Sequence, residues 1–259
     1  MRIIAIALLM TLLFAAGGAT QDKAVQVVSL EAPPLVYTMN GEVYGALVDV
    51  VREGLARMGH STQITIMPWS RAMASVRYGD ADAVFYAIWT EERSEYLHYP
   101  DEPLWEERTV AVQLVNGSVS LDADLTNADN VRLGVGRGYY YGPHLEKLLK
   151  NKAFASVEAV VNAENNLNKL LAGRIDAFLT DYFNALKLLR DHAVGMRLEI
   201  VSDMDGKPAI LDSSQSFLAF SREVMTGDMA RRFSLTLKEM KRDGTYERIM
   251  ARYMLDLPE

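Results

Sequence analysis

The sequence lacks cysteine and has only four histidines, all scattered. The absence of cysteine excludes a disulfide framework, a thiol nucleophile and a lipid-modified N-terminal cysteine. The histidines show none of the close spacings found in zinc sites, and no G-x-S-x-G nucleophile elbow is present. We therefore expect no metal, no other cofactor and no catalytic residue.

Basic charge is also scarce. The formal net charge is −7, and no cluster of Lys or Arg is available to neutralise a phosphate backbone. Nucleic acid is therefore not an expected partner. Hydrophobic residues make up 49% of the chain, enough to form a folded core and to exclude a disordered protein.

The N-terminus has the composition of a secretory signal peptide. Arg2 is followed by a strongly apolar run at 3–16 and then by small residues. The run has 14 residues, fewer than the ~20 that a membrane-spanning helix needs. We expect cleavage of residues 1–19 and a mature chain that is free in the periplasm and is not a lipoprotein.

Predicted strands and helices alternate along the remaining chain. For example, Leu47, Val51, Leu55 and Met58 share one helical face, which ends at Gly59. The predicted strands lie at 24–30, 62–67, 81–87, 130–136, 155–161, 175–180 and 216–221. The predicted helices lie at 46–59, 70–78, 143–150, 163–173, 181–191, 222–244 and 245–255. Strands separated by helices of this length predict βαβ units and parallel sheets.

One short pattern occurs twice, at 76–87 and 170–181. Each copy has a helix end, a glycine, two further residues, the pair Asp-Ala and an apolar strand. The repeat suggests two similar lobes. It predicts a structural role for Asp82 and Asp176, as acceptors from local backbone where the chain enters the strand. Asp80 is predicted to be a solvated turn residue.

The glycine-rich segment 134–142, GVGRGYYYG, follows a predicted strand and precedes a predicted helix. A tyrosine replaces the last glycine of the G-x-G-x-x-G pattern, which argues against dinucleotide binding. Backbone N–H groups at the start of the following helix still predict an anion site. A ligand carboxylate is one candidate for that anion.

Seven blocks, in this order, resemble the family 3 periplasmic solute-binding proteins, the polar amino-acid receptors of ABC transporters. They are EAPPLVY, GALVDVVREGLARMG, PWSRAMASVRYGDADAVF, TEERSEYLHYPDEPLWEE, VRLGVGRGYYYG, LLAGRIDAFLTD and LKEMKRDGTYERIMARYM. The resemblance implies a two-lobed α/β type II periplasmic binding protein fold, in which each lobe is a mostly parallel sheet flanked by helices. The chain would cross between the lobes twice, with lobe 1 at 24–107 plus 217–259 and lobe 2 at 108–216.

The resemblance also implies two charged anchors for a ligand. Arg93 matches the family's clamp on the ligand α-carboxylate, and a planar guanidinium suits that bidentate contact. The alternative for Arg93 is a surface ion pair with a neighbouring glutamate. Asp181 matches the acid that accepts from the α-ammonium, and it stands at the C-terminal end of a predicted strand, where ligands of parallel sheets bind. Its alternative is that of a helix N-terminal acid.

Further positions are implied by the same likeness. Trp69 matches an aromatic that packs on the ligand side chain, although a core tryptophan is the alternative. Tyr86 and Ile88 match positions that mainly offer backbone groups to the ligand. The lobe 2 turn that gives backbone N–H groups to the carboxylate would comprise Gly138, Tyr139 and Tyr140.

The chain departs from the family pattern around the side-chain pocket. Ala32 and Leu35 replace aromatic residues on either side of the proline pair, and Tyr37 is a candidate to compensate. Glu31 either faces the pocket, where it would favour a cationic ligand group, or lies on the surface. These departures indicate an unusual amino acid or another small polar metabolite.

The leading interpretation is a monomeric binding protein that captures a small zwitterion or carboxylate and delivers it to an ABC permease. A secreted, dehydratase-like enzyme on the same fold is the alternative, with Glu31 or Asp181 as its acid or base. A soluble module that presents its ligand to a membrane sensor is a third possibility.

Overall fold

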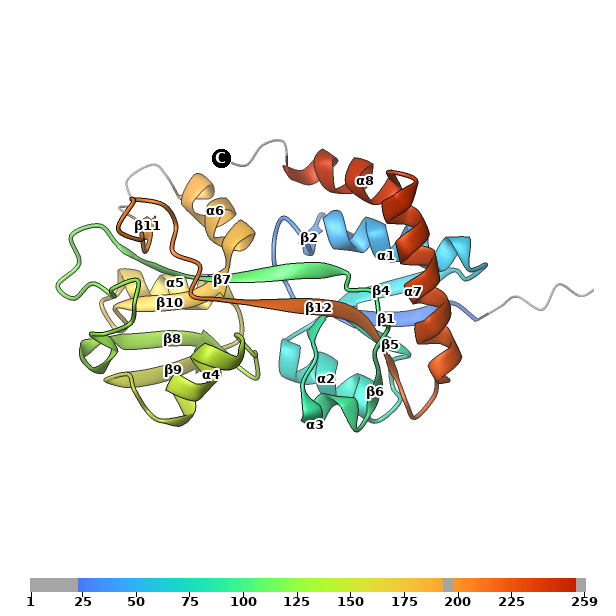
Figure 1. The fold of residues 1–259 in the computed structure, drawn as a ribbon, viewed down its shortest axis with the longest axis horizontal. Helices are drawn as coiled ribbons and strands as arrows, with labels where there is room; N and C mark the ends of the chain where they lie inside the picture. The colour runs from blue at the N-terminus through green and yellow to red at the C-terminus, as the bar shows by residue number, and fades with distance from the viewer. Residues whose placement is uncertain (1–22, 193–197, 255–259) are drawn as a thin grey trace, which may run out of the picture.

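The computed structural model describes residues 23–192 and 198–254. The predicted signal peptide lies outside the described residues. The described chain forms two α/β lobes that lie side by side and are joined by two long strands (Figure 1).

The sheet of lobe 1 is built around three parallel strands. β1 (Val25–Ser29) pairs in parallel with β4 (Thr62–Ile66) on one side and with β5 (Ala83–Ile88) on the other. β5 also pairs antiparallel with β12 (Asp212–Ser221). β12 in turn pairs with the short β6 (Leu97–His98). The predicted strands are confirmed, and the last of them begins four residues earlier than its apolar run indicated.

Lobe 2 repeats this plan. β8 (Arg132–Gly136) pairs in parallel with β9 (Ser156–Val160) and β10 (Ala177–Asp181). β7 (Trp105–Leu114) runs antiparallel to β10 and also pairs with β11 (Leu198–Ile200). Each lobe therefore has a parallel centre and an antiparallel strand that leads to the other lobe.

The connection between the lobes is a two-stranded ribbon. The first half of β7 pairs antiparallel with the first half of β12, in register from Trp105↔Ser216 to Thr109↔Asp212. Figure 1 shows the two strands crossing together from one lobe to the other. This pairing makes a single continuous sheet in the order β4-β1-β5-β12-β7-β10-β8-β9.

Helices cover the sheets as the apolar periodicity predicted. In lobe 1 these are α1 (Ala46–Arg57), α2 (Trp69–Arg77), the short α3 (Glu91–Ser94), α7 (Gly227–Arg242) and α8 (Thr245–Met254). In lobe 2 they are α4 (Pro143–Lys150), α5 (Ala163–Leu171), α6 (Tyr182–Asp191) and the 3₁₀ turn Ala128–Asn130. A small hairpin, β2 (Tyr37–Met39) with β3 (Glu42–Tyr44), stands apart from the main sheet.

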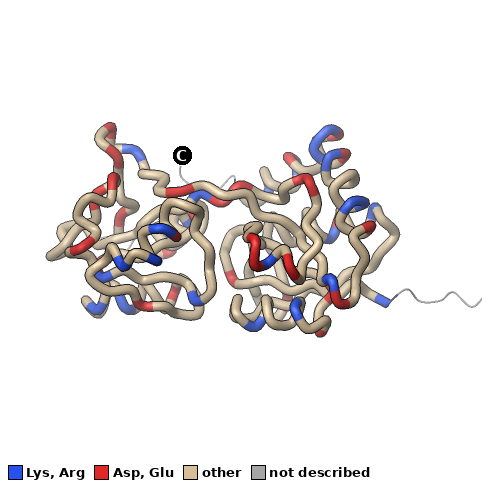
Figure 2. Tube along the Cα trace, turned by 60° about the horizontal axis from the view of Figure 1, so that its bottom comes forward, with Lys and Arg blue, Asp and Glu red and all other residues tan. Residues whose placement is uncertain are grey.

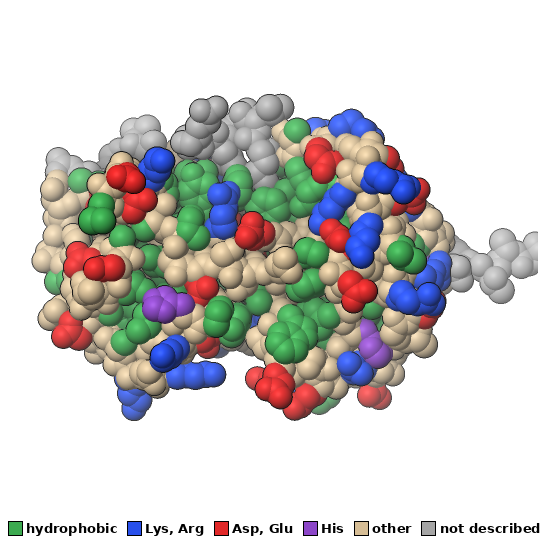
Figure 3. All heavy atoms as spheres, in the orientation of Figure 1, with side chains coloured by type: hydrophobic (Ala, Val, Ile, Leu, Met, Phe, Trp, Pro, Cys, Tyr) green, Lys and Arg blue, Asp and Glu red, His purple; other side chains and the backbone are tan. Residues whose placement is uncertain are grey.

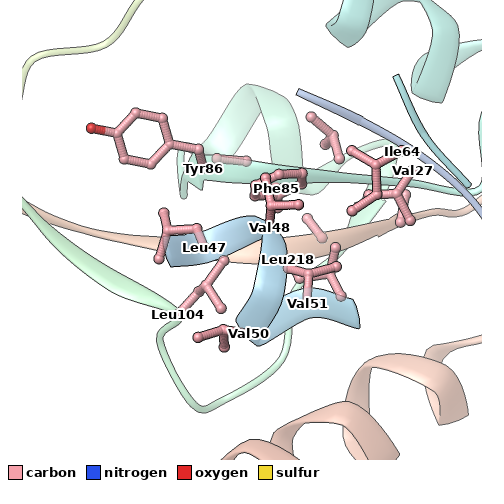
Figure 4. Close-up of a cluster of buried hydrophobic side chains, with 14 of the residues drawn as sticks. Val27, Leu47, Val48, Val50, Val51, Ile64, Phe85, Tyr86, Leu104 and Leu218 are labelled. Atoms are coloured by element: carbon pink, nitrogen blue, oxygen red, sulfur yellow. The ribbon is translucent and has the colours of Figure 1, made fainter. Parts of the chain in front are cut away.

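The buried hydrophobic side chains form separate cores. One core draws on residues between 25 and 104 and between 218 and 250, and it includes Phe85, Leu47 and Leu218 (Figure 4). Two further clusters contain only residues between 110 and 211. We therefore propose the described parts of 24–107 plus 217–259 as lobe 1 and of 108–216 as lobe 2.

Asp82 and Asp176 have the structural role that the repeated pattern predicted, but with different partners. The Asp82 carboxylate accepts from the backbone N–H of Gln26 at 2.8 Å, and Asp176 accepts from that of Arg132 at 2.8 Å. Gln26 lies near the start of β1, the neighbour of β5, and Arg132 lies at the start of β8, the neighbour of β10. Local backbone bonds were expected, but each bond instead joins two strands. Each aspartate fixes the register of two parallel strands in its own lobe.

Charged side chains of both signs are interspersed on both lobes (Figure 2). In the space-filling view, a notch separates the lobes at the edge opposite the connecting strands (Figure 3). No helix within the described residues is long and apolar enough to cross a membrane.

Candidate ligand-binding site

A cavity lies between the lobes. It has a volume of about 630 Å³, part of which is open to solvent at its mouth. Its walls come from the ends of β1, β5, β8 and β10, from α5 and from the crossing strand β7. Eight of the predicted site residues line it: Glu31, Trp69, Tyr86, Ile88, Arg93, Tyr139, Tyr140 and Asp181. Gly138 is not among the lining residues, but its carbonyl accepts from two of them, Trp69 and Arg93.

Arg93 is the cation of this cavity. It follows the N-cap Thr90, whose hydroxyl accepts from the Arg93 backbone N–H, and only 8% of its surface is exposed. The guanidinium donates to the carbonyls of Ile88 at 2.8 Å and Gly138 at 3.2 Å and lies 5.4 Å from the ring of Trp69. No ion pair found in the described chain includes it. The alternative of a surface ion pair is therefore wrong.

Trp69 combines the two roles that were considered for it. The side chain is 4% exposed and packs on the lobe 1 core, yet it also lines the cavity. Its Nε1 donates to the Gly138 carbonyl at 3.0 Å, and the Ser70 hydroxyl donates to the Arg137 carbonyl at 3.2 Å. Together with Arg93, these bonds hold lobe 1 against lobe 2 in a closed arrangement.

Tyr86 contributes a side chain where backbone groups were expected. β5 has a bulge opposite Leu218, because the register with β12 shifts between Phe217 and Ala219. At this bulge Tyr86 has a φ of 66°, which is unusual for a side chain of its size. Its ring points away from the other labelled side chains of this core (Figure 4), and its buried hydroxyl has no hydrogen-bond partner within the described part of the chain. Burial, followed by the nearby Asp181 and Glu107, raises the pKa of this hydroxyl well above its usual value.

Asp181 ends β10 and caps α6. One carboxylate oxygen accepts from the backbone N–H of Phe183 at 2.9 Å, and the other accepts from that of Arg108 at 3.2 Å. Burial nevertheless raises the pKa of Asp181 to about 6, against the lowering effect of these bonds. Both predicted roles, a helix N-terminal acid and a cavity acid, are thus present in one residue.

The sequence analysis missed a second acid in the cavity, Glu107. It lies on β7, and its Oε1 atom is buried without a hydrogen-bond partner. Burial raises the pKa of Glu107 well above its usual value, and the neighbouring Asp181 adds to this effect. A signal was available, because Glu107 stands at the predicted boundary between lobe 1 and lobe 2, where one face of a crossing strand lines the cleft.

The predicted anion site at the start of α4 is already occupied within the protein. The Asp212 carboxylate accepts from the backbone N–H groups of His144 at 2.9 Å and Leu145 at 3.1 Å. The expectation that these groups bind a ligand carboxylate is therefore wrong. Upstream, the Gly138 carbonyl is bound by Trp69 and Arg93, while Tyr139 and Tyr140 present aromatic surface to the cavity.

The remaining predicted residues are Glu31, Ile88 and Tyr37, and each already contacts another residue of the protein. Glu31 lies at the cavity, but its two oxygens accept from the backbone N–H and the hydroxyl of Thr38, at 3.1 and 3.4 Å. The Ile88 carbonyl is occupied by Arg93 and by the Tyr99 hydroxyl. Tyr37 is not among the residues that line the cavity and instead stacks on Tyr44, with ring centroids 6.1 Å apart.

Two α/β lobes around a closed polar cavity define the class of protein: a two-lobed binding protein with its site at the interface. The sequence agrees with this class. Residues 25–256 match the family model of the bacterial extracellular solute-binding proteins, family 3. The chain therefore belongs to this family, as the seven sequence blocks indicated.

Solved structures share the fold. A variant of the arginine-binding protein ArgBP from T. maritima aligns with a TM-score of 0.74 and 20% identity, over 90% of this chain and 96% of its own. The arginine-, lysine-, histidine-binding protein ArtJ from Geobacillus stearothermophilus gives 0.74 and 20%, over 92% and 97%. A histidine kinase sensor domain with similarity to periplasmic binding proteins gives 0.75 and 18%, over 91% and 97%. No protein of curated function matches the sequence.

The described residues contain no group of three or more His, Asp or Glu side chains placed to hold a metal ion.

Proposed function

We propose that the protein captures a small α-amino acid, or a zwitterion of similar size, in the cavity between its lobes and delivers it to an ABC transporter. Arg93 binds the ligand carboxylate and Asp181 accepts from the ligand ammonium. Family membership supports the class of function, and the structurally similar proteins ArgBP and ArtJ are named for amino acids.

The observation that carries the proposal is the state of Arg93. A buried guanidinium is costly unless a negative group balances its charge. Here its partners are two neutral carbonyls, and it faces the cavity. A ligand carboxylate supplies the missing charge and fits the planar donor group of arginine.

The charge on the opposite side favours a zwitterion. Asp181 accepts from the backbone N–H groups of Phe183 and Arg108, but burial still raises its pKa to about 6, so its ionised form is less stable in the cavity than in water. A ligand ammonium group beside Asp181 would stabilise the ionised carboxylate and lower its pKa. A ligand with a carboxylate near Arg93 and an ammonium near Asp181 therefore satisfies both groups.

We further propose that no bond of the ligand is made or broken, that the protein acts as a monomer and that it is periplasmic after loss of residues 1–19, without lipid attachment. The extracellular assignment of the family agrees with this location. Binding is coupled to closure, because a ligand stabilises the closed form through contacts with both lobes.

The first experiment is a thermal-shift screen of the mature protein against the standard amino acids, polyamines and di- and tricarboxylates. A ligand that binds only the folded state raises the melting temperature by mass action. We expect the response to be confined to α-amino acids. A response to dicarboxylates alone would contradict the role of Asp181.

Replacement of Arg93 tests the proposed contact. Arg93→Ala should lower the affinity for the amino acid found in the screen by about 100-fold or more, since charged hydrogen-bonded partners in buried sites contribute strongly. The protein should remain folded, because the Ile88 carbonyl keeps Tyr99 and the Gly138 carbonyl keeps Trp69. Calorimetric titration gives the affinity, and Arg71→Ala, at an exposed arginine of α2, is the control. Unchanged affinity in Arg93→Ala would refute the assignment.

A further inference from the structure

The charges that line the cavity do not balance. Arg93 is its cation, whereas Asp181 and Glu107 are both acidic. Glu31, the remaining acid at the cavity wall, is engaged by Thr38. A neutral amino acid would pair with Arg93 and Asp181 and would leave Glu107 without a cationic partner.

Glu107 and Asp181 face the same cavity for a reason of register. Asp181 on β10 is directly opposite Thr109 on β7, and Glu107 is two residues from Thr109 along the same strand. Alternate residues of a strand share a face, so the two acids are diagonal neighbours, with backbones about 7–8 Å apart. One small ligand can therefore contact both.

Tyr86 adds an independent sign of a ligand group at this point. Its side chain is 5% exposed and lines the cavity, and its hydroxyl has no hydrogen-bond partner among the described residues. The Glu107 Oε1 atom is likewise buried and unpartnered. Buried polar groups are nearly always hydrogen-bonded, so two such atoms in one cavity indicate donors that the ligand supplies.

We propose that Glu107 and Tyr86 form a second polar subsite, which binds a cationic group on the ligand side chain. The ligand is then a basic amino acid, with its α-carboxylate on Arg93, its α-ammonium at Asp181 and its second cationic group between Glu107 and Tyr86. This inference rests on the proposed function and narrows it. The net charge of these three ionised groups, −1, is neutralised by a ligand of charge +1.

The test uses pairs of ligands that have similar size and differ in charge: L-arginine with L-citrulline, and L-ornithine with L-glutamine. The wild-type protein should bind the charged member of each pair at least about 10-fold more tightly, because hydrogen bonds between charged groups are roughly twice as strong as neutral ones. Glu107→Gln should abolish that preference and leave the affinity for the neutral member unchanged within about threefold. Retained binding of the neutral ligand would show that the variant is folded.

The control is Glu106→Gln. Glu106 is the exposed neighbour of Glu107 on the other face of β7, where it accepts from the Ser213 hydroxyl at 2.9 Å. Glu106→Gln should leave the affinities for the charged ligand and for the neutral ligand unchanged. An equal loss of preference in the two variants would indicate a long-range charge effect and would overturn the subsite.

Proton exchange provides a second readout. Titrations in two buffers of different ionisation enthalpy report the protons released on binding. Burial and the neighbouring Asp181 raise the pKa of Glu107, which also faces Arg93 and Tyr139. A cationic ligand group beside Glu107 should lower that pKa, so a charged ligand should release more protons on binding than a neutral ligand does. Glu107→Gln should remove the difference between the two ligands.

The outcomes separate this inference from the function on which it rests. Equal binding of charged and neutral amino acids, unaffected by Glu107→Gln, would overturn the cationic subsite and leave the proposed function standing. Binding of putrescine with no binding of any amino acid would keep the subsite and overturn the proposed function. Binding of none of these probes would overturn both.

Discussion

Asp181 has two roles that place opposite demands on its charge. As the cap of α6 it accepts from backbone N–H groups, which favour the ionised carboxylate. As a wall of the cavity it is withdrawn from water, which favours the neutral acid, and burial is the stronger effect because the pKa rises to about 6. The ionised Asp181 is therefore less stable in the folded protein than in water, and a bound cationic group would stabilise it.

This conflict predicts a pH dependence of stability. Between the ordinary pKa of 3.8 and the folded value of about 6, the folded protein holds a proton that the unfolded chain has released. The free energy of unfolding without ligand therefore falls as the pH rises through this window, by on the order of 2–3 kcal/mol for this residue. Asp181→Asn should keep the helix cap, escape this decline and be more stable than the wild type above pH 7.

Urea denaturation at several pH values measures this effect as the difference between the two proteins. The stability advantage of Asp181→Asn should grow from pH 4 to pH 6 and then level off. Amino-acid binding by the variant should be strongly weakened at every pH. If the variant were less stable than the wild type at pH 8, the backbone N–H groups that donate to Asp181 would be enough to stabilise its ionised form. Burial would then not be the stronger effect.

At the scale of elements, the start of α4 shows how a sequence pattern can mislead. The segment GVGRGYYYG predicted a helix N-terminus that is free to bind an anion, and the helix is there, from Pro143. The anion, however, comes from Asp212, which lies about 70 residues away in the crossing strand β12. Nothing in the local sequence could show this, because the strand pairing that brings Asp212 to α4 is a property of the folded chain.

Gly142 is shaped by the same contact. It has a φ of 106°, and a Cβ atom built on it would lie 2.2 Å from the Asp212 carboxyl carbon. Only glycine leaves room for the carboxylate to reach the helix. The glycine-rich segment therefore serves the cap, not a phosphate or a nucleotide.

Removal of this cap should weaken lobe 2 and leave the ligand site intact. Asp212→Ala deprives two backbone N–H groups of their acceptor, which should lower the free energy of unfolding by about 1 kcal/mol, within the usual range of 0.5–2. Asp212 does not line the cavity, so ligand affinity should change by less than about threefold. Chemical denaturation and calorimetric titration measure the two effects. Asp212→Asn, which keeps an acceptor oxygen, should lose less stability, and a loss of affinity without loss of stability would contradict this account.

At the scale of the whole molecule, the sequence was informative about the fold and only partly about the site. The order of strands and helices follows from local periodicity and capping, and the seven blocks indicated the two-lobed arrangement. Arg93, Trp69 and Asp181 line the cavity, and their contacts with a ligand stay predictions. Glu107 was missed because its burial depends on β7 crossing to β10. Tyr37 was expected at the pocket, but its hairpin turns it towards Tyr44.

The lobes are in contact across the cleft through a small set of bonds. Side chains of lobe 1 donate to the carbonyls of Arg137 and Gly138 in lobe 2. Among the described residues, each hydrophobic core cluster has buried members from one lobe alone. The partly buried Tyr139 packs against one cluster of lobe 1 and one of lobe 2. Because so few bonds join these surfaces, their removal should shift the equilibrium between closed and open forms.

Trp69→Phe tests this expectation. The change removes the bond from Nε1 to the Gly138 carbonyl while keeping an aromatic ring on the lobe 1 core. A hydrogen bond of about 0.5–1.5 kcal/mol corresponds to a two- to tenfold shift towards the open form. Small-angle X-ray scattering should show a larger radius of gyration without ligand and a return to the wild-type value with ligand. Trp89→Phe, at an exposed tryptophan, is the control, and identical scattering from Trp69→Phe and the wild type would exclude a role for this bond in closure.

The most direct test of the central claim changes the ligand and the protein together. Calorimetry would compare wild type and Arg93→Ala, each titrated with the amino acid that gives the largest thermal shift and with its α-carboxamide. If Arg93 binds the α-carboxylate, the carboxamide should bind the wild type at least about 100-fold more weakly but bind Arg93→Ala no more weakly than the amino acid does. Equal losses in the two proteins would mean that the carboxylate is bound elsewhere, and the proposed site would be wrong.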